Sequence, residues 1–185
     1  MKIILASKSP RRQQLLTDIG LHFEVKFFDV EESYPDSLSN TEIPVFLAEL
    51  KAKPFEGILM EDELVISADT IVCLGEDVLG KPDNEQEATE ILLKLSGKKH
   101  QVITGVCLKS LNKQYSFYSV TDVFFKILSS EEIAYYIDNY KPFDKAGAYG
   151  IQEWIGYIGI NRIEGSFYNV MGLPIQRIYE EIQKF

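Results

Sequence analysis

The segment Ser7–Arg12 combines hydroxyl side chains with two guanidinium groups, which are residue types suited to binding a phosphate. It follows a short apolar run that predicts a strand. Ser9 fits a helix N-cap, and Pro10 fits the first position of that helix. The backbone N–H groups and the positive end of the helix dipole would face an anion bound above the loop, and Arg11 or Arg12 could bind it as well. An ordinary capped helix with solvated arginines would have the same residues, so other segments must decide.

A carboxylate, that of Asp69, interrupts the apolar and β-branched run 64–74, which predicts a strand. A charged group inside a buried strand needs a cation or hydrogen-bond donors as partners. Asp69 is therefore a residue that could carry chemistry, and the alternative is a structural acid bonded to turn amides. Lys81 lies between Gly80 and Pro82. This short, rigid setting suits a fixed ammonium group, although a solvated loop lysine would fit it too.

Two further clusters contain groups that could contact a nucleotide. The spacing of Gly147 and Gly150 allows a tight backbone course near a ligand, and Gln152 follows them. A primary amide is both donor and acceptor, so Gln152 could pair with the N3–H and carbonyl edge of uracil or thymine, whereas a surface glutamine is the simpler alternative. Glu31 and Glu32 lie in a polar segment, where a pair of acids is usually just exposed.

The elements that must position these residues mix helices with strands along the whole chain. Thr41 predicts the N-cap of a helix that continues to about Lys53, with Lys51 available to a cleft or to solvent. Apolar spacing predicts strands at 3–6, 23–28, 64–74, 78–79, 100–109, 115–127 and 154–163. Helices are predicted at 10–20, 84–97 and 129–140 and from 174 onward, and Asn84 and Ser129 fit the N-caps of the second and third of these. A long hairpin interrupts any regular β-α-β alternation. We therefore expect an α/β fold with a mixed twisted sheet, in which two lobes of a single domain over 1–185 flank a central cleft.

Composition limits the classes of function. The formal net charge of −9 argues against a surface for nucleic-acid polymers, so an anion site must be a local basic pocket. Cys73 and Cys107 lie in apolar β-like runs without metal-ligand spacing, which predicts buried thiols in a reducing cytoplasm. No apolar run approaches membrane-spanning length, so we expect no membrane partner. The histidines, His22 and His100, are isolated, so they indicate neither a histidine metal site nor a Ser-His dyad, and neither a P-loop nor a Rossmann glycine motif is present.

Seven motifs together resemble the Maf family of nucleoside triphosphate pyrophosphatases, and the match is collinear from end to end. They are Leu-Ala-Ser-x-Ser-Pro-Arg-Arg at 5–12, Ala-Asp-Thr-Ile-Val at 68–72, Gly-Lys-Pro at 80–82, Leu-Ser-Gly at 95–97, Thr-Gly-Val at 104–106, Asp-Lys-Ala-Gly-Ala-Tyr-Gly-Ile-Gln at 144–152 and Val-Met-Gly-Leu-Pro at 170–174. The resemblance implies a two-lobed α/β fold related to inosine triphosphate pyrophosphatases, a divalent cation (Mg²⁺ or Mn²⁺) and a homodimer. It also implies hydrolysis of a nucleoside triphosphate to the monophosphate and pyrophosphate.

Within the family, the chain resembles the branch that acts on dTTP and UTP. The selectivity positions of that branch correspond to Arg12, Thr70 and Gln152. The proton-accepting aspartate of the family corresponds to Asp69. Its other cleft residues correspond to Ser7, Glu32, Lys51 and Lys81, with Arg11 or Arg12 near the phosphates, and we expect Glu32 and Asp69 to bind the metal.

Two alternatives stay open at this point. A 7-methyl-GTP pyrophosphatase of the same family would differ at the aspartate-threonine and glutamine motifs. A non-catalytic nucleotide-binding regulator of septum formation would not need intact Asp69, Lys51 and Lys81. The chain also departs from the family after Gln152, where Glu153 and Trp154 replace a commonly glycine-rich turn.

Overall fold

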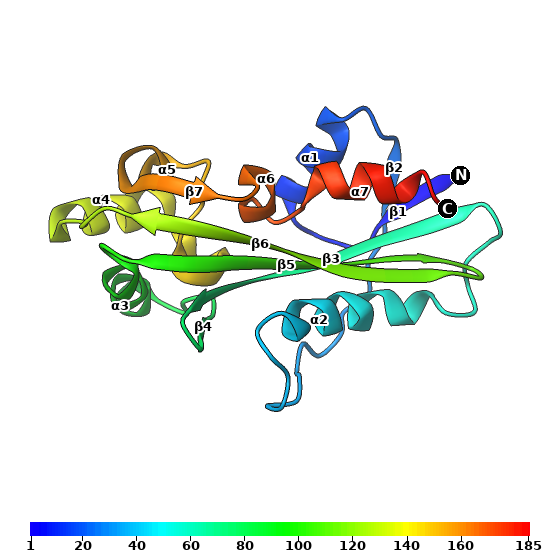
Figure 1. Ribbon diagram of the computed structural model, residues 1–185, viewed down its shortest axis with the longest axis horizontal. Coiled ribbons are helices and arrows are strands. Elements are labelled where there is room, and N and C mark those ends of the chain that lie inside the picture. Colours follow the sequence, from blue (N-terminus) through cyan, green and yellow to red (C-terminus); the bar gives the residue numbers. More distant parts are fainter. The chain divides into compact units, whose positions relative to one another are not determined.

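A seven-stranded mixed sheet organises the fold, with the strand order β2-β1-β3-β5-β6-β7 and β4 paired with β3 (Figure 1). The computed structural model describes all 185 residues. The strands are β1 (Lys2–Leu5), β2 (Phe23–Val25), β3 (Glu63–Leu74), β4 (Asp77–Leu79), β5 (Lys99–Ser110), β6 (Gln114–Phe125) and β7 (Ile160–Glu164). The helices are α1 (Pro10–Asp18), α2 (Glu42–Ala52), α3 (Glu85–Leu95), α4 (Ser130–Tyr140), α5 (Trp154–Gly159), α6 (Phe167–Val170) and α7 (Ile175–Ile182), with short 3-10 helices η1 (Lys53–Phe55), η2 (Pro142–Asp144) and η3 (Ala146–Ala148). The expected mixed α/β class is confirmed.

The chain divides into two compact units, and the long strands β3, β5 and β6 contribute residues to both. Unit 1 comprises Met1–Thr70, Thr104–Ser119 and Gly172–Phe185, and unit 2 comprises Ile71–Ile103 and Val120–Met171. No helix is long and apolar enough to cross a membrane.

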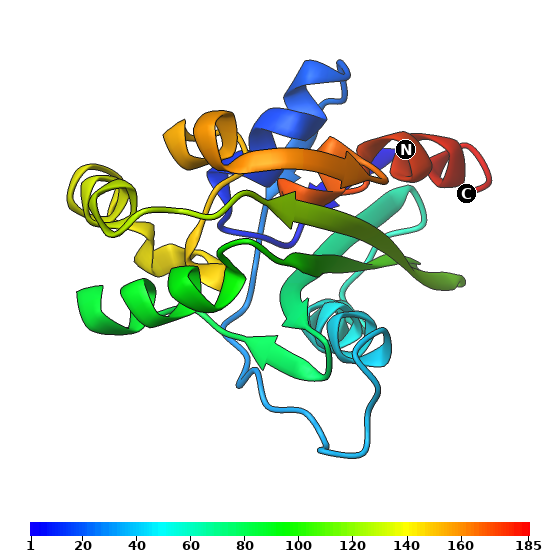
Figure 2. The same cartoon turned by 60° about the vertical axis from the view of Figure 1, so that its left-hand side comes forward.

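In unit 1, the parallel strands β1, β2 and β3 lead into the predicted phosphate-binding segment. Ile3 of β1 is in register with Phe23 of β2 and Leu64 of β3. Ser9 caps α1 as predicted, because its side chain accepts a hydrogen bond from the backbone N–H of Arg12. Helix α2 lies on one side of these strands, whereas α1 and α7 lie on the other (Figures 1 and 2).

The close packing of α2 against the sheet depends on small residues. The hydroxyl of Ser67 in β3 donates to the carbonyl of Ala48 in α2 at 2.7 Å. A Cβ on Gly105 of β5 would lie only 2.2 Å from the carbonyl carbon of Pro44, so a glycine is required there. These two contacts fix the distance between α2 and the sheet, and therefore the distance of Lys51 from β3.

Two local predictions were wrong. Thr41 makes no capping hydrogen bond, and the backbone N–H and the hydroxyl of Ser39 both donate to the Glu42 carboxylate instead. The segment 154–163 is not one strand, because α5 forms first and only Ile160–Glu164 pairs with β6. The remaining predicted strands and helices are present, although β2 ends already at Val25.

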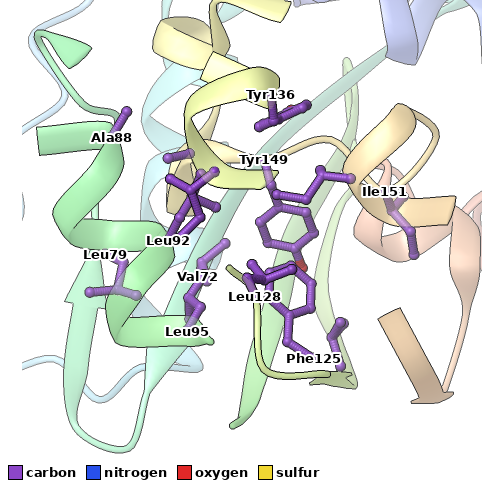
Figure 3. Close-up of a cluster of buried hydrophobic side chains, with 14 of the residues drawn as sticks. Val72, Leu79, Ala88, Leu92, Leu95, Phe125, Leu128, Tyr136, Tyr149 and Ile151 are labelled. Atoms are coloured by element: carbon purple, nitrogen blue, oxygen red, sulfur yellow. The ribbon is translucent and has the colours of Figure 1, made fainter. Parts of the chain in front are cut away.

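The main core of unit 2 packs α3, α4 and η3 around aromatic rings from β6 and the 146–150 loop. Figure 3 shows Leu92 and Leu95 of α3 with Val72, Tyr149 and Phe125 in this cluster. The rings of Phe125 and Tyr149 meet edge to face at 5.0 Å. This core holds the loop that precedes Gln152. Elsewhere the two cysteines, Cys73 and Cys107, are buried and free, as the sequence predicts.

Candidate functional site

Lys51, Asp69 and Glu32 form a compact ion-paired cluster in unit 1. The Nζ atom of Lys51 lies 2.6 Å from Oδ1 of Asp69 and 3.1 Å from Oε2 of Glu32. The side chains of Lys51 and Asp69 are 16% and 13% exposed, whereas that of Glu32 is 48% exposed. Two carboxylates from segments far apart in the sequence therefore converge on a single cation.

Each member of this cluster is presented by a different element. Asp69 follows the buried Ala68 near the middle of β3, and Lys51 lies in the last turn of α2. Glu32 belongs to the irregular segment between β2 and α2. The carboxylate that interrupts a buried strand thus has the cation partner that its sequence context demands.

Arg12 is bonded to acceptors of its own unit. Its Nε donates to the carbonyl of Gly172 at 2.8 Å, and its Nη1 donates to the carbonyl of Ala68 at 2.8 Å and to Oγ of Ser7 at 3.3 Å. Its Nη2 donates to Oγ1 of Thr70 at 3.1 Å. Desolvation lowers the pKa of the Arg12 guanidinium from its ordinary value, and the charge of Asp69 acts in the opposite direction. The guanidinium therefore ties the Ser7 loop, β3 and the Gly172 segment to one another.

Besides Arg12, Thr70 contacts two residues that the sequence analysis did not identify as site residues. Its Oγ1 lies 3.0 Å from Oγ1 of Thr104 and 3.5 Å from the carbonyl of Gly172. Gly172 adopts φ +112°, a left-handed conformation that favours glycine. Both supporting residues belong to motifs on which the family resemblance depends, and this was the available signal.

Lys81 and Gln152 lie in unit 2, on loops that are bonded to each other. The N–H of Gly147 donates to the carbonyl of Gly80 at 3.0 Å, which joins the loop before Gln152 to the turn that presents Lys81. Lys81 is exposed, and Gln152 is half-buried. The Oε1 atom of Gln152 is buried and accepts no hydrogen bond, so its capacity as an acceptor is unused in the free protein.

The predicted site residues therefore fall into two groups. Six of them belong to unit 1 and form two networks beside β3. One network is the ion-paired set of Lys51, Asp69 and Glu32, and the other is the hydrogen-bonded set of Arg12, Ser7 and Thr70. Arg11 belongs to the first turn of α1 in the same unit, where it is half-buried. Lys81 and Gln152 belong to unit 2.

The donor set of unit 1 fits a hard divalent cation. Glu32 and Asp69 supply two carboxylates that already share one positive group, the ammonium of Lys51. No group of three or more His, Cys, Asp or Glu residues is placed to hold a metal ion. Mg²⁺ suits such a sparse set, because it commonly keeps several waters and binds through one or two carboxylates together with substrate phosphates.

Comparison with known proteins assigns the chain to a family. A model of the family described as Maf-like protein matches residues 2–185. The chain belongs to this family. It is 58% identical over 184 residues to a protein of Phocaeicola vulgatus named dTTP/UTP pyrophosphatase, covering 99% of this chain and 95% of that protein. A Parabacteroides distasonis protein of the same name is 53% identical over 185 residues, covering 100% of this chain and 96% of the relative.

Solved structures with similar folds are more distant. The Ham1 protein of Staphylococcus aureus matches with a TM-score of 0.48 at 20% identity, over 68% of this chain and 72% of that chain. A nucleoside-triphosphatase, also titled dITP/XTP pyrophosphatase, from Mycobacterium abscessus matches with a TM-score of 0.46 at 11% identity, over 99% and 95% of the two chains.

Proposed function

We propose that this Maf-family protein hydrolyses dTTP and UTP to the nucleoside monophosphate and pyrophosphate. The observation that carries the proposal is the Lys51 ammonium held between Asp69 and Glu32, because phosphoryl transfer requires cations beside a group that can accept a proton. The names of relatives that are more than half identical over nearly the full chain support the choice of substrate.

Asp69 is the proposed proton acceptor. A water molecule attacks the α-phosphorus, its proton passes to the Asp69 carboxylate, and the bond to the bridging oxygen breaks so that pyrophosphate leaves. In the free protein Asp69 is ion-paired with Lys51. A triphosphate oxygen would offer the Lys51 ammonium an alternative anion, and this exchange would free the carboxylate for the proton.

The cationic residues would stabilise the charge of the triphosphate and of the leaving pyrophosphate. Lys51 and Arg11 in unit 1 and Lys81 in unit 2 are the proposed phosphate ligands, together with the backbone N–H groups at the start of α1. Because Arg12 donates to four acceptors of its own unit, its proposed role is to hold Thr70 and Ser7 in place beside the substrate.

We further propose that Glu32 and Asp69 bind a divalent metal ion, Mg²⁺ or Mn²⁺, when nucleotide is present. Such an ion supplies charge neutralisation at the phosphates and increases the acidity of a bound water. The two carboxylates can serve it because their shared partner, Lys51, has the triphosphate as an alternative.

Selection of uracil and thymine is assigned to Gln152, whose buried Oε1 lacks a donor and could accept a hydrogen bond from the N3–H of either base. Cytosine has no hydrogen on N3. A buried acceptor left unpaired costs about 1–3 kcal/mol, which is the expected size of the discrimination.

A panel of nucleotides tests the proposed function. Pyrophosphate release is measured with dTTP, UTP, CTP and 7-methyl-GTP in the presence of Mg²⁺, Mn²⁺ or EDTA. We expect turnover of dTTP and UTP with either metal, weak turnover of the other two nucleotides, and none with EDTA. Preferred hydrolysis of 7-methyl-GTP, or no hydrolysis of any of the four, would refute the proposal.

Two further properties follow only from family resemblance and residue chemistry. We propose that the protein is a homodimer, which sedimentation at micromolar concentration would test. We also propose a cytoplasmic location, since both cysteines are free thiols, as expected in a reducing compartment.

A further inference from the structure

Glu153 follows Gln152 directly, and its carboxylate is bonded on both sides. The Oε2 atom accepts a short hydrogen bond from the hydroxyl of Tyr136, and Oε1 lies 3.2 Å from Nζ of Lys145. The side chain of Glu153 is 19% exposed and that of Lys145 is 8% exposed. Lys145 also pairs with Asp144 at 2.7 Å.

Tyr136 and Glu153 also join the two ends of the turn that contains Gln152. The hydroxyl of Tyr136 accepts a hydrogen bond from the N–H of Gly150 at 3.0 Å while it donates to Glu153. The N–H of Glu153 donates to the carbonyl of Gly150 at 3.0 Å. Gly150 and Glu153 are thus joined directly and also through Tyr136, and Gln152 lies between them.

The Glu153 carboxylate packs against the first residue of the turn. A Cβ on Gly150 would lie 2.8 Å from Cδ of Glu153, because the carboxylate lies directly over the glycine. On the other side, the hydroxyl of Tyr157 donates to the carbonyl of Gln152 at 2.8 Å. The backbone of Gln152 is therefore fixed from both sides, and its side chain starts from a defined position.

A buried ion pair is a poor source of stability, since desolvation of the charges offsets their attraction. Lys145 and Glu153 are better explained by the geometry that they impose. Desolvation and the neighbouring Glu153 raise the pKa of Tyr136, so its hydroxyl keeps its proton and remains a donor to the carboxylate throughout the physiological range.

We propose that Glu153, held by Tyr136 and Lys145, is a positioning residue that aims the Gln152 amide and thereby sets the preference for uracil and thymine over cytosine. This inference rests on the proposed function. Glu153 does not contact the reacting phosphates in this assignment, so it acts only through Gln152. Its substitution is expected to alter the choice among nucleotides and not the chemical step.

The test compares Glu153→Gln with the parent protein by the ratio of kcat/KM for UTP to that for CTP. The amide keeps the size of the side chain but removes the charge that pairs with Lys145. We expect the ratio to fall by about fivefold or more, through a higher KM for UTP at nearly unchanged kcat. A ratio within about twofold of the parent value would overturn the proposal.

A double-mutant cycle separates positioning from a general loss of structure. In a Gln152→Ala background, Glu153→Gln should leave the UTP to CTP ratio unchanged, because the residue through which it acts is gone. A further fall of the ratio in that background would contradict the proposal. Glu132→Gln is the matched control, since it removes a partly buried ion pair of unit 2, with Lys126 at 2.5 Å, that does not contact the turn.

Tyr136→Phe provides a second variant should Glu153→Gln fold poorly. It removes the hydroxyl that joins Gly150 to Glu153 and should lower the ratio in the same direction, whereas an unaltered ratio would count against the proposal. Trp154, the only tryptophan, follows Glu153, so its fluorescence should report the altered turn in both variants. A parent protein that does not prefer UTP to CTP would refute the proposed function itself, which is a distinct outcome.

Discussion

The Asp69 cluster of unit 1 and the Gln152 turn of unit 2 use charged residues in opposite ways. In unit 1 the charged residues are themselves the proposed reacting and binding groups. Lys51 contacts Asp69 and the more exposed Glu32 directly. In unit 2 the ion pair of Lys145 and Glu153 has only a supporting role, because the proposed binding group is the uncharged amide of Gln152.

This difference follows from what each region must do under the proposed function. A residue that accepts a proton or binds phosphate has to exchange partners during a turnover, so its ion pairs must be replaceable. A residue that distinguishes two bases by one hydrogen bond has to stay in one orientation, so its supports must be buried and fully bonded. Substitutions in the Asp69 cluster should therefore change the rate for every nucleotide, and substitutions in the Gln152 turn should change the preference among nucleotides.

The largest effect is expected for Asp69→Asn, which keeps the shape of the side chain but removes its ability to accept a proton. We expect kcat to fall by about 10³-fold or more, and by the same factor for UTP, dTTP and CTP. Asp122→Asn is the control, because Asp122 is also a strand carboxylate paired with a lysine, Lys99 at 2.9 Å. Activity of Asp69→Asn within tenfold of the parent would exclude the role as base.

Lys51→Met should have the next largest effect. It removes a cation from the proposed phosphate site, so kcat/KM should fall by about 10²-fold for all nucleotides. It also leaves Asp69 and Glu32 as two adjacent carboxylates without their shared partner, and calorimetric titration should show tighter Mg²⁺ binding in the absence of nucleotide.

Lys109→Met is the matched control for Lys51→Met. Lys109 belongs to unit 1 and is 13% exposed, and it pairs with Glu56 at 2.9 Å. If Lys51→Met bound Mg²⁺ no more tightly than the Lys109 variant, Glu32 and Asp69 would not form the proposed metal site.

Gln152→Ala should alter selectivity with little effect on catalysis, in contrast to both variants of unit 1. The ratio of kcat/KM for UTP to that for CTP should fall by about 5- to 150-fold, which corresponds to an unpaired base edge. Gln101→Ala removes another partly buried amide of unit 2, which donates to Asp122 at 2.9 Å, and should leave the ratio unchanged. Equal ratios for the Gln152 variant and the parent would remove this residue from base recognition.

The sequence predicts those parts of the fold that depend on neighbours along the chain. The caps at Ser9, Asn84 and Ser129 were predicted correctly, because each side chain bonds a backbone N–H three residues later. The segment after Trp154 was predicted wrongly, since both α5 and β7 contain similar apolar residues. Only the pairing of Ile160–Glu164 with β6 distinguishes them, and that pairing is a tertiary contact.

The candidate site shows the same limit. Asp69 could be identified because a carboxylate is unexpected inside an apolar, buried strand. The bond from Arg12 to the Gly172 carbonyl spans 160 residues of sequence, and a backbone acceptor has no residue-type signal at all. Glu153 has no signal in its own sequence context, and its bonds to Tyr136 and Lys145 could not be predicted from spacing.

The smallest expected effect is on the pH dependence of the unfolding free energy, and it distinguishes the two histidines, one in each unit. His100 of unit 2 is buried, with Nε2 2.8 Å from the hydroxyl of Tyr149 and no hydrogen bond at Nδ1. Desolvation lowers the pKa of His100 to about 4. The unfolded chain, with an ordinary histidine pKa of about 6.5, therefore binds a proton that the folded chain does not bind as the pH falls below that value.

The contribution of His100 to stability is thus present above about pH 6.5 and is lost as the pH falls toward 4. Between pH 7 and pH 5 this loss amounts to about 2 kcal/mol. In urea denaturation, His100→Gln should flatten the dependence of the unfolding free energy on pH over this range. His22→Gln is the control variant, because His22 of unit 1 is exposed. Parallel pH profiles for the parent and His100→Gln would mean that a group other than His100 controls the loss of stability in acid.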